Sequence, residues 1–254
     1  MIMSFNKSAL LSMSAAAILG LAACNKTTTA PSQTTSGGST STAPSGAVAK
    51  ADKRALVRFI NATQTSKDLY FGDTVAFSNV APETASAYVE LPSERHEFKL
   101  FDAGNGAGKP LASNSEGPTA GQHYTVVALN GTNGKAILDP VSDDIAQPDP
   151  GKAKLRVIHA APGVKKVDVY PAGGRDALIS GVGFKDATSY KQVDPILSEV
   201  DVRTEGSKAS GVKARNLMLA PGKSYTLLVM GGNGRPLALK VVEDRLVQAV
   251  ASAF

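Results

Sequence analysis

The chain has 254 residues, with 27 Lys and Arg against 22 Asp and Glu, and a formal net charge of +5. The charge is small and scattered, which argues against a nucleic-acid groove, so no nucleic-acid partner is expected. The absence of tryptophan, the 6% aromatic content and the 24 glycines indicate short strands joined by many turns, and a single cysteine excludes an internal disulfide.

Residues 1–23 have the pattern of a secretory signal peptide. Lys7 is the only charged side chain before Cys24, and residues 9–21 are apolar apart from two serines. A charged start, an apolar middle and small residues at the exit are typical of such signals. The apolar run is shorter than the roughly 20 residues that a transmembrane helix needs. We therefore predict that residues 1–23 are removed.

Residues 21–24, Leu-Ala-Ala-Cys, resemble the lipobox of bacterial lipoproteins. The resemblance implies cleavage before Cys24, a diacylglycerol thioether on its sulfur and an acyl chain on its amino group. More than one chain is needed for stable anchoring, because a single myristoyl-sized chain holds a protein only marginally. Asn25, where an Asp would favour the inner membrane, points to the outer membrane, on its periplasmic or surface side. The alternative is a secreted protein with a buried cysteine.

Residues 24–52 are predicted to be the lipidated cysteine and a disordered linker. Thr, Ser, Pro, Gly and Ala dominate residues 25–49, and Lys26 is the only charge among them. Such a segment cannot bury enough apolar surface to offset the entropy lost on ordering. A bare tether is favoured over a glycosylated one.

The remainder contains two copies of one unit, offset by about 100 residues. The matched segments are 57–62 with 155–160, 68–70 with 168–170, 77–80 with 179–182, 121–126 with 222–227, and 133–134 with 233–234. The tyrosines also form matched pairs: Tyr70 with Tyr170, Tyr88 with Tyr190, and Tyr124 with Tyr225. Each copy is large enough for its own core, so we predict two modules, residues 53–146 and 150–254.

The segments within each copy are short, rich in β-branched or aromatic residues, and bounded by turn residues. In the second copy the predicted strands are residues 153–160, 167–170, 187–192, 199–204, 224–230 and 236–242. Leu155, Val157 and His159 alternate with polar or oppositely facing neighbours, as in a strand with one face in a core. About six or seven strands in about 90 residues is the density of a β-sandwich.

Residues 219–225 have the form Leu-x-Pro-Gly-x-x-Tyr, which predicts a tyrosine corner of a Greek-key sandwich at Tyr225. In this motif the tyrosine hydroxyl bonds to backbone just upstream. The first copy keeps the glycine and Tyr124 but has Pro118 and Ala120 at the other two positions. The corner at Tyr124 is therefore weaker evidence.

Residues 155–162, Leu-Arg-Val-Ile-His-Ala-Ala-Pro, followed by Val-Asp-Val-Tyr at 167–170, resemble the bacterial envelope family catalogued as domain of unknown function 4397. The first copy diverges, with Asn61 in place of His159 and Thr-Gln at 63–64 in place of Ala-Pro. The resemblance implies an immunoglobulin-like sandwich on exported proteins. It brings no activity and no catalytic residues. The expected fold is all-β, a tandem of two Greek-key immunoglobulin-like β-sandwiches.

No catalytic, cofactor or metal motif stands out. The sequence has no Gly-x-Ser-x-Gly elbow, and its three histidines lack zinc-ligand spacing. We therefore expect no enzyme, no cofactor and no metal site. His159 is predicted to be a hydrogen-bonded core residue, and the glycine-rich residues 104–109 a flexible hairpin tip rather than a phosphate loop.

Three further groups allow two interpretations each. Aspartates near the junction between the copies are solvated linker charges or calcium ligands: Asp139, Asp143, Asp144 and Asp149. The matched tyrosines are packed core residues or a platform for sugars. Arg58 and Arg156 are ligand handles or cross-strand partners for Asp68 and Asp168, and the cross-strand interpretation is favoured.

The expected function is a lipid-anchored cell-envelope protein with a structural or adhesive binding role and no catalysis. Its expected partners are the membrane, through the lipid, and an envelope polysaccharide or protein. The alternative is a carbohydrate- or peptidoglycan-binding accessory lipoprotein. A hydrolase with an unrecognised carboxylate pair is a third candidate.

Overall fold

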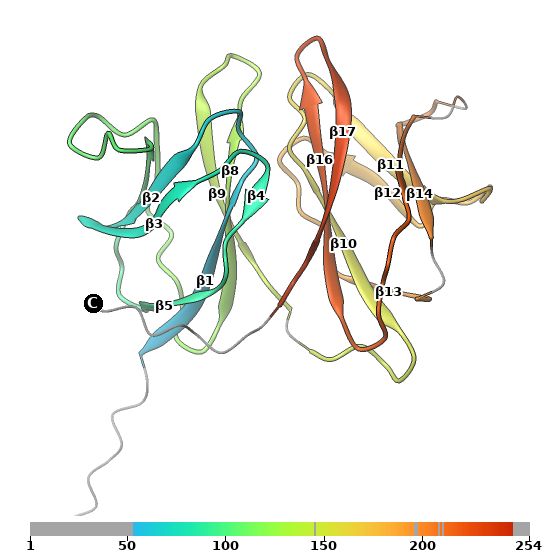
Figure 1. Cartoon of the computed structure of the whole chain (residues 1–254), viewed down its shortest axis with the longest axis horizontal. Helices are drawn as coiled ribbons and strands as arrows, with labels where there is room; N and C mark the ends of the chain where they lie inside the picture. The colour runs from blue at the N-terminus through green and yellow to red at the C-terminus, as the bar shows by residue number, and fades with distance from the viewer. Residues whose placement is uncertain (1–52, 145, 196–197, 208, 210, 246–254) are drawn as a thin grey trace, which may run out of the picture. The chain divides into compact units, whose positions relative to one another are not determined.

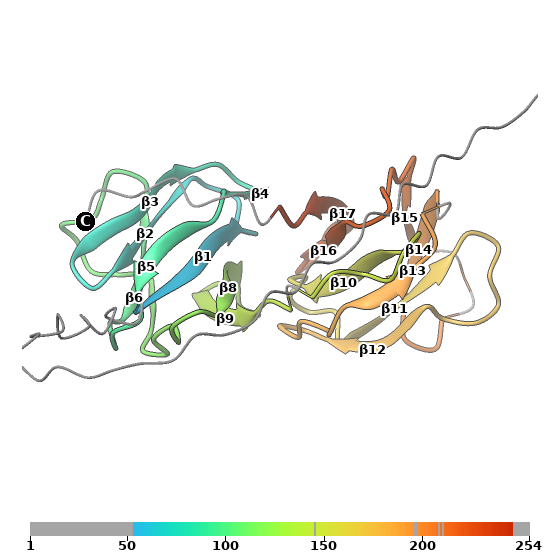
Figure 2. The same cartoon turned by 90° about the horizontal axis from the view of Figure 1, so that it is seen from below.

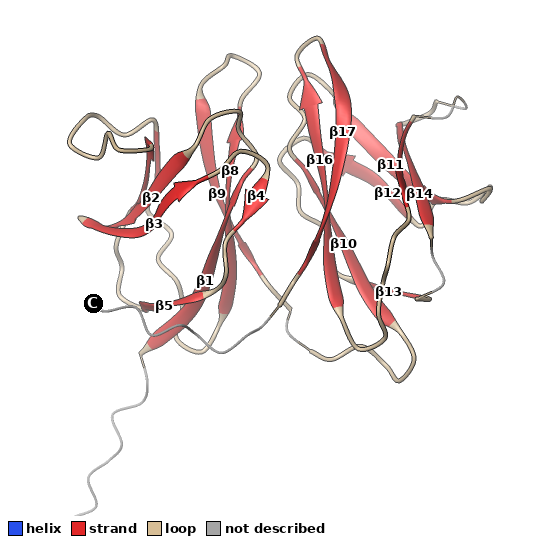
Figure 3. Cartoon of the chain, viewed as in Figure 1, coloured by secondary structure: helices blue, strands red, loops and turns tan. Residues whose placement is uncertain are grey.

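The computed structural model describes residues 53–144, 146–195, 198–207, 209 and 211–245. These residues belong to one compact unit. The predicted signal peptide, Cys24 and the linker lie outside the described residues. Within the described part the secondary structure consists of strands, without a helix (Figure 3). No helix long and apolar enough to cross a membrane occurs in this part of the chain.

Module 1 consists of two sheets. Its strands are β1 (Arg54–Asn61), β2 (Lys67–Phe71), β3 (Thr74–Val80), β4 (Thr84–Ala85), β5 (Val89–Pro92), β6 (Phe98–Asp102), β7 (Ala112–Asn114), β8 (His123–Asn130) and β9 (Ala136–Ser142). The β1 sheet has the order β4-β1-β8-β9, with β5 also paired to β1, and the β2 sheet has the order β3-β2-β6-β7 (Figure 1). Strands β1 and β8 are parallel, and the other pairs are antiparallel.

Module 2 repeats this arrangement. Its strands are β10 (Ala153–His159), β11 (Lys166–Pro171), β12 (Ile179–Gly183), β13 (Lys191–Val193), β14 (Glu199–Thr204), β15 (Val212–Arg215), β16 (Ser224–Gly232) and β17 (Arg235–Glu243). The β10 sheet has the order β13-β10-β16-β17 and the β11 sheet the order β12-β11-β14-β15 (Figure 2). Strands β10 and β16 are parallel, as β1 and β8 are in module 1. The matched topologies confirm the all-β tandem of sandwiches.

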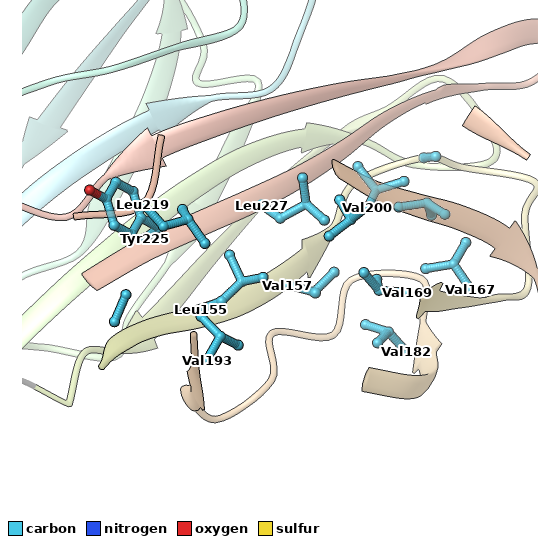
Figure 4. Close-up of a cluster of buried hydrophobic side chains, with 14 residues drawn as sticks. Leu155, Val157, Val167, Val169, Val182, Val193, Val200, Leu219, Tyr225 and Leu227 are labelled. Carbon is cyan, nitrogen blue, oxygen red and sulfur yellow. The ribbon is translucent and has the colours of Figure 1, made fainter. Parts of the chain in front are cut away.

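Each module has a core between its own two sheets. In module 2, Leu155 and Val157 of the β10 sheet face Val167, Val169 and Val200 of the β11 sheet (Figure 4). The alternation of side chains along each strand produces this core, because every second residue points to the same face. Fully burying one such side chain contributes about 1.5–3 kcal/mol. The equivalent core of module 1 lies between β1 and β8 on one side and β2 and β6 on the other.

A third hydrophobic cluster joins the two modules. It consists of residues on the opposite faces of the β1 and β10 sheets: Ile60, Ala62, Val127, Leu129, Ile158, Ala160, Leu228 and Met230. The two central strands of each sheet are therefore covered on both faces, and all seven residues of β10 are buried. Strands buried on both faces are hydrophobic almost throughout, which explains the apolar runs around Val57 and Val157.

The predicted strands of module 2 differ from the structure in three places. The predicted strand 187–192 is instead an isolated bridge at Ala187 followed by β13. Strand β12 is not among the predicted strands. A bulge interrupts its alternating pattern, with Gly181 at a φ of +69°. Strand β15 escaped prediction because it is a short, half-exposed edge with alternating charges, which resembles a loop in sequence. The strand predicted at 199–204 is confirmed.

His159 is a core residue, as predicted, with 0% of its surface exposed. Its Nδ1 accepts a hydrogen bond from the Ala161 amide at 3.2 Å, so its Nε2 is the protonated nitrogen and donates to the Val164 carbonyl at 3.1 Å. Asn61 makes the equivalent hydrogen bonds in module 1. Its Oδ1 accepts from the Thr63 amide at 3.0 Å, and its Nδ2 donates to the Thr65 carbonyl at 2.9 Å. The two copies therefore have different residues at this position, Asn61 and His159, but equivalent local hydrogen bonds.

Candidate functional site

The most unusual chemical feature of the described chain is a pair of buried arginines between the modules. Arg58 lies on β1 and Arg156 on β10, and each has 1% of its surface exposed. Because neighbouring residues of a strand point to opposite faces, Arg58 points away from the core that contains Val57 and Phe59. It therefore points at module 2, alongside the third cluster. A buried guanidinium requires a full set of acceptors.

Arg58 of module 1 is paired mainly with module 2. Its Nη1 lies 2.6 Å from Oδ1 of Asp244, which follows β17. Its Nη2 donates to the Thr226 hydroxyl at 3.3 Å, and its Nε donates to the Thr125 hydroxyl of its own module at 2.8 Å. All three nitrogens of the guanidinium thus have acceptors, and an ion pair crosses between the modules.

Arg156 of module 2 makes the reciprocal set of contacts. Its Nη2 lies 2.6 Å from Oδ1 of Asp143, which follows β9, and donates to the Thr125 hydroxyl at 3.0 Å. Its Nε donates to the Thr226 hydroxyl of its own module at 2.9 Å. Its Nη1 donates weakly to the Ser142 carbonyl at 3.5 Å. The two arginines therefore exchange carboxylate partners across the contact.

Threonines and tyrosines complete the network. Thr125 donates to Asp143 at 2.8 Å, and Thr226 donates to Asp244 at 2.8 Å. Since a hydroxyl has one proton and two acceptor sites, each threonine is saturated by one carboxylate and two guanidinium groups. The hydroxyls of Tyr88 and Tyr190 donate to Asp143 and Asp244, each at 2.7 Å.

The electrostatics of the network favour fixed charges. Burial alone lowers the pKa of Arg58, but the negative charges of Asp244 and Asp143 raise it, and the net pKa lies above the ordinary value. Burial chiefly raises the pKa of Tyr88 and of Tyr190, so both phenols stay protonated donors. The rings of these tyrosines also cover the guanidiniums, with Arg156 4.7 Å from the centroid of Tyr190. Arg58 therefore stays charged, and the phenols of Tyr88 and Tyr190 stay protonated, at neutral pH.

The favoured sequence interpretation of Arg58 and Arg156, as cross-strand partners of Asp68 and Asp168, is wrong. Asp168 accepts a hydrogen bond from the Gly181 amide at 2.8 Å, and Asp68 accepts from the Asn79 amide at 2.6 Å. Both aspartates therefore hold the bulged strand beside them. They lie on the second sheet of each module, whereas the arginines point out of the first sheet toward the other module.

The junction aspartates do not form one group. Asp143 is paired with Arg156, and Asp144 lies 2.6 Å from the Lys154 ammonium. Among the described residues no set of three or more His, Cys, Asp or Glu side chains lies close enough to hold a metal ion. The described residues therefore contain no cluster of carboxylates that could hold calcium at the junction.

The two tyrosines predicted at corners differ in their contacts. The Tyr225 hydroxyl accepts from the Ala220 amide at 2.9 Å and donates to the Met218 carbonyl at 3.3 Å, both upstream in the chain. Tyr124 accepts a longer bond, 3.3 Å, from the Thr119 amide. Residues 104–109 form the turn of the hairpin between β6 and β7.

Surface hollows of the modules are mostly polar. One of them, about 790 Å³, lies on module 1 and is lined by residues 93–95 and 113–120. A second, about 520 Å³, lies at the edge of the network beside Asp143, Arg156 and Tyr190. A third, about 470 Å³, lies on module 2 near Pro171 and Leu178. Among the described residues, the lining of the hollow on module 1 includes Glu94, Arg95 and Glu116 but no histidine or cysteine.

The sequence contains part of the signal for this network. Arg58 matches Arg156, and Tyr88 matches Tyr190, at the offset of the repeat. The matched carboxylates are harder to find, because Asp143 lies next to the linker and Asp244 follows the last predicted strand. Buried charges that recur in both copies at the offset of the repeat would have indicated a shared polar contact.

Comparisons with known proteins agree with the repeat. A family model described as a domain of unknown function, DUF4397, matches residues 55–170 and again residues 153–253. No curated protein matches. One similar solved structure is the C-terminal domain of AlgF from P. aeruginosa, with 24% identity and a TM-score of 0.30, covering 37% of this chain and 98% of that one.

Proposed function

The chain belongs to the family described as domain of unknown function DUF4397, and we propose that it is a lipid-anchored structural or adhesive protein of the cell envelope, without catalysis. The observation that supports this most is the buried network between the modules. Its charged groups are saturated by each other, so they are suited to holding two sandwiches together rather than to acting on a substrate.

A doubled sandwich of this kind suits a structural role. The ion pairs Arg58–Asp244 and Arg156–Asp143 lie among side chains that are almost wholly buried. Such pairs are weak evidence for stability in themselves, but they specify one way of docking, because any other arrangement leaves a charge unpaired. The modules would then present their outer sheets and loops at fixed positions on a lipid tether at Cys24.

The proposal includes the finer fold assignment. Each module would be a Greek-key, immunoglobulin-like sandwich, and the Tyr225 bonds to Met218 and Ala220 support this for module 2. The outer membrane is the proposed location, on the basis of the residues around Cys24.

Palmitate labelling and detergent-free fractionation test the anchor. Cells that produce the wild-type chain should incorporate label and hold the protein in the membrane fraction, whereas Cys24→Ala should do neither. Cross-linking of intact cells then tests the binding role, with adducts to an envelope protein or polysaccharide expected only for the anchored chain. An unlabelled wild type, or a cleaved Cys24→Ala form that stays in the membrane, contradicts the anchor. Absence of adducts contradicts the binding role.

The polar hollow on module 1 favours a second candidate, a carbohydrate- or peptidoglycan-binding accessory. Glu94, Arg95, Asn114 and Glu116 line it and offer donors and acceptors of the kind that sugar hydroxyls use. The test is co-sedimentation of the chain with purified peptidoglycan. Binding that Arg95→Ala abolishes, and that the distant exposed control Lys213→Ala leaves intact, supports this candidate. Equal sedimentation of all three proteins contradicts a site in this hollow.

A further inference from the structure

We propose that the hollow beside Arg156 binds a neutral sugar unit of a polysaccharide. This inference rests on the polysaccharide partner proposed above and assigns that partner to one place on the chain. The hollow, called here the Arg156 hollow, has a volume of about 520 Å³, and its lining includes Gln122, Asp144, Arg156, Ser189 and Tyr190. Sites for small molecules typically have volumes of about 300–1,000 Å³.

The guanidinium of Arg156 has one nitrogen without a strong acceptor among the described residues. Its Nε and Nη2 lie within 3.0 Å of hydroxyl or carboxylate oxygens, whereas Nη1 has the Ser142 carbonyl at 3.5 Å. Hydrogen bonds from N–H to oxygen usually measure about 2.7–3.2 Å. In Arg58, by contrast, each of the three nitrogens has an acceptor within 3.3 Å. Since Arg156 is 1% exposed and lines the hollow, a ligand oxygen there can complete its hydrogen bonds.

The two ends of the ionic network differ in the residues around them. Beside Asp244, the partner of Arg58, the charged residues pair with each other: Glu243 lies 3.7 Å from Lys223 and 3.0 Å from Arg245. The residues at the matching positions of the repeat, on the side of Arg156, are Ser142, Gln122 and Asp144. A hydroxyl, a neutral amide and one carboxylate therefore stand where the other end has a set of paired charges. Such groups are suited to the hydroxyls of a ligand.

The charges around the hollow cancel, which favours a neutral ligand. Arg156 is paired with Asp143, and the Asp144 carboxylate lies 2.6 Å from the Lys154 ammonium. An anionic ligand would add a negative charge beside two aspartates, and a cationic ligand would add a positive charge beside Arg156. A hydroxyl group can accept from Nη1 of Arg156 and donate to Asp144, whose oxygens are held by Lys154 and by the Ala146 amide. A sugar carries several such hydroxyls.

Tyr190 supplies an aromatic wall for the ligand. It lines the hollow, and its hydroxyl is held by Asp244 at 2.7 Å. The Arg156 guanidinium and the Lys154 ammonium lie 4.7 Å and 5.1 Å from the centroid of its ring, which fixes the ring in place. The apolar face of a sugar can pack against such a ring while its hydroxyls bind the polar groups. An aromatic wall with a few convergent polar groups is the usual composition of a small-molecule site.

Titration of the full chain with the methyl glycosides of glucose, galactose, mannose and N-acetylglucosamine tests the site. Two-dimensional amide NMR spectra should show saturable shifts for at least one probe, centred on the amides of Gln122, Ser189 and Tyr190. Ser189→Leu fills the hollow and Gln122→Ala removes a polar group at its edge, so each should raise the Kd by about tenfold. If Ser189→Leu does not fold, Gln122→Ala decides.

The matched controls are Ala87→Leu and Lys223→Ala, at the equivalent positions beside Arg58, and both should bind as the wild type does. Absence of saturable shifts with all four probes overturns the site. Binding that Arg95→Ala abolishes and that Ser189→Leu leaves intact also overturns it, because the sugar then occupies the hollow on module 1. In either case, adducts to an envelope polysaccharide in intact cells would still support the proposed function, so the two failures are distinguishable.

Discussion

At the scale of single residues, buried charge is the main determinant of how this molecule responds to substitution. Arg58 has an acceptor for each of its three guanidinium nitrogens, namely the hydroxyls of Thr125 and Thr226 and the carboxylate of Asp244. A charge of this kind contributes little net stability when paired. Removing the arginine, however, leaves a buried carboxylate without a counter-charge, which strongly destabilises the folded state.

We expect Arg58→Met to lower the free energy of unfolding by about 3–5 kcal/mol, because it leaves Asp244 buried without its cation. Urea denaturation of the full chain measures this. Lys213→Met is the control, since it removes an exposed ion pair with Glu199 and should shift the midpoint little. Equal midpoints for the two variants would mean that Asp244 is not desolvated.

His159 should make stability depend on pH. Burial lowers the pKa of His159 below its ordinary value of 6.5, so the unfolded chain binds a proton at pH values where the folded chain does not. The stability that comes from the neutral ring is therefore present above pH 6.5 and is lost as the pH falls below it. His159→Asn should remove this loss, because Asn61 makes the equivalent bonds in module 1 without titrating.

The comparison is the difference in urea midpoint between pH 7.5 and pH 5.5 for the wild type and for His159→Asn. His123, whose pKa burial also lowers, contributes equally to both proteins. An unchanged pH dependence in the variant would show that His159 does not titrate as inferred.

At the scale of elements, the sequence predicted the strands whose pattern is local. Strands β10, β14 and β16 agree within a residue or two with the predicted 153–160, 199–204 and 224–230, because alternation and turn residues mark them. Strands β12 and β15 were missed because a bulge and an exposed edge weaken that pattern. The contact between the modules was missed for a different reason. Arg58 and Asp244 are far apart in the chain, and no local pattern predicts their pairing.

The Tyr225 hydroxyl ties the start of β16 to the preceding loop, so its removal should destabilise that element. Tyr225→Phe leaves the Ala220 amide and the Met218 carbonyl without this partner, at a cost of about 1–3 kcal/mol. For a folded unit of about 150–250 residues, the melting temperature should fall by about 2–4 °C for each kcal/mol of stability lost. Tyr124→Phe, which removes only a 3.3 Å bond, should have a smaller effect. Circular dichroism melts of the two variants distinguish these outcomes.

At the scale of the whole molecule, the two modules share one hydrophobic cluster and one ionic network in addition to their separate cores. The repeat in the sequence predicted two domains, each with its own core, and the structure contains both cores. The sequence did not indicate how strongly the modules depend on each other, because their outward faces look like ordinary strand faces until they are placed together.

We expect the full chain to unfold in a single transition. Separating the modules would expose the third cluster and leave Arg58 and Arg156 without their carboxylate partners. Differential scanning calorimetry should give a calorimetric enthalpy equal to the van't Hoff enthalpy. Arg156→Met, which leaves Asp143 unpaired, should lower the temperature of that one transition. Two separate transitions in the wild type would show that the modules unfold independently.

The position of Asp244 also has a consequence for biosynthesis. A ribosome completes all nine strands of module 1 when Ser142 has been added, yet the carboxylate that neutralises Arg58 follows about 100 residues later. Nascent or truncated chains that end before Asp244 hold an uncompensated cation at an uncovered apolar face. We therefore expect proteases to degrade chains that are truncated before Asp244 faster than chains that include it.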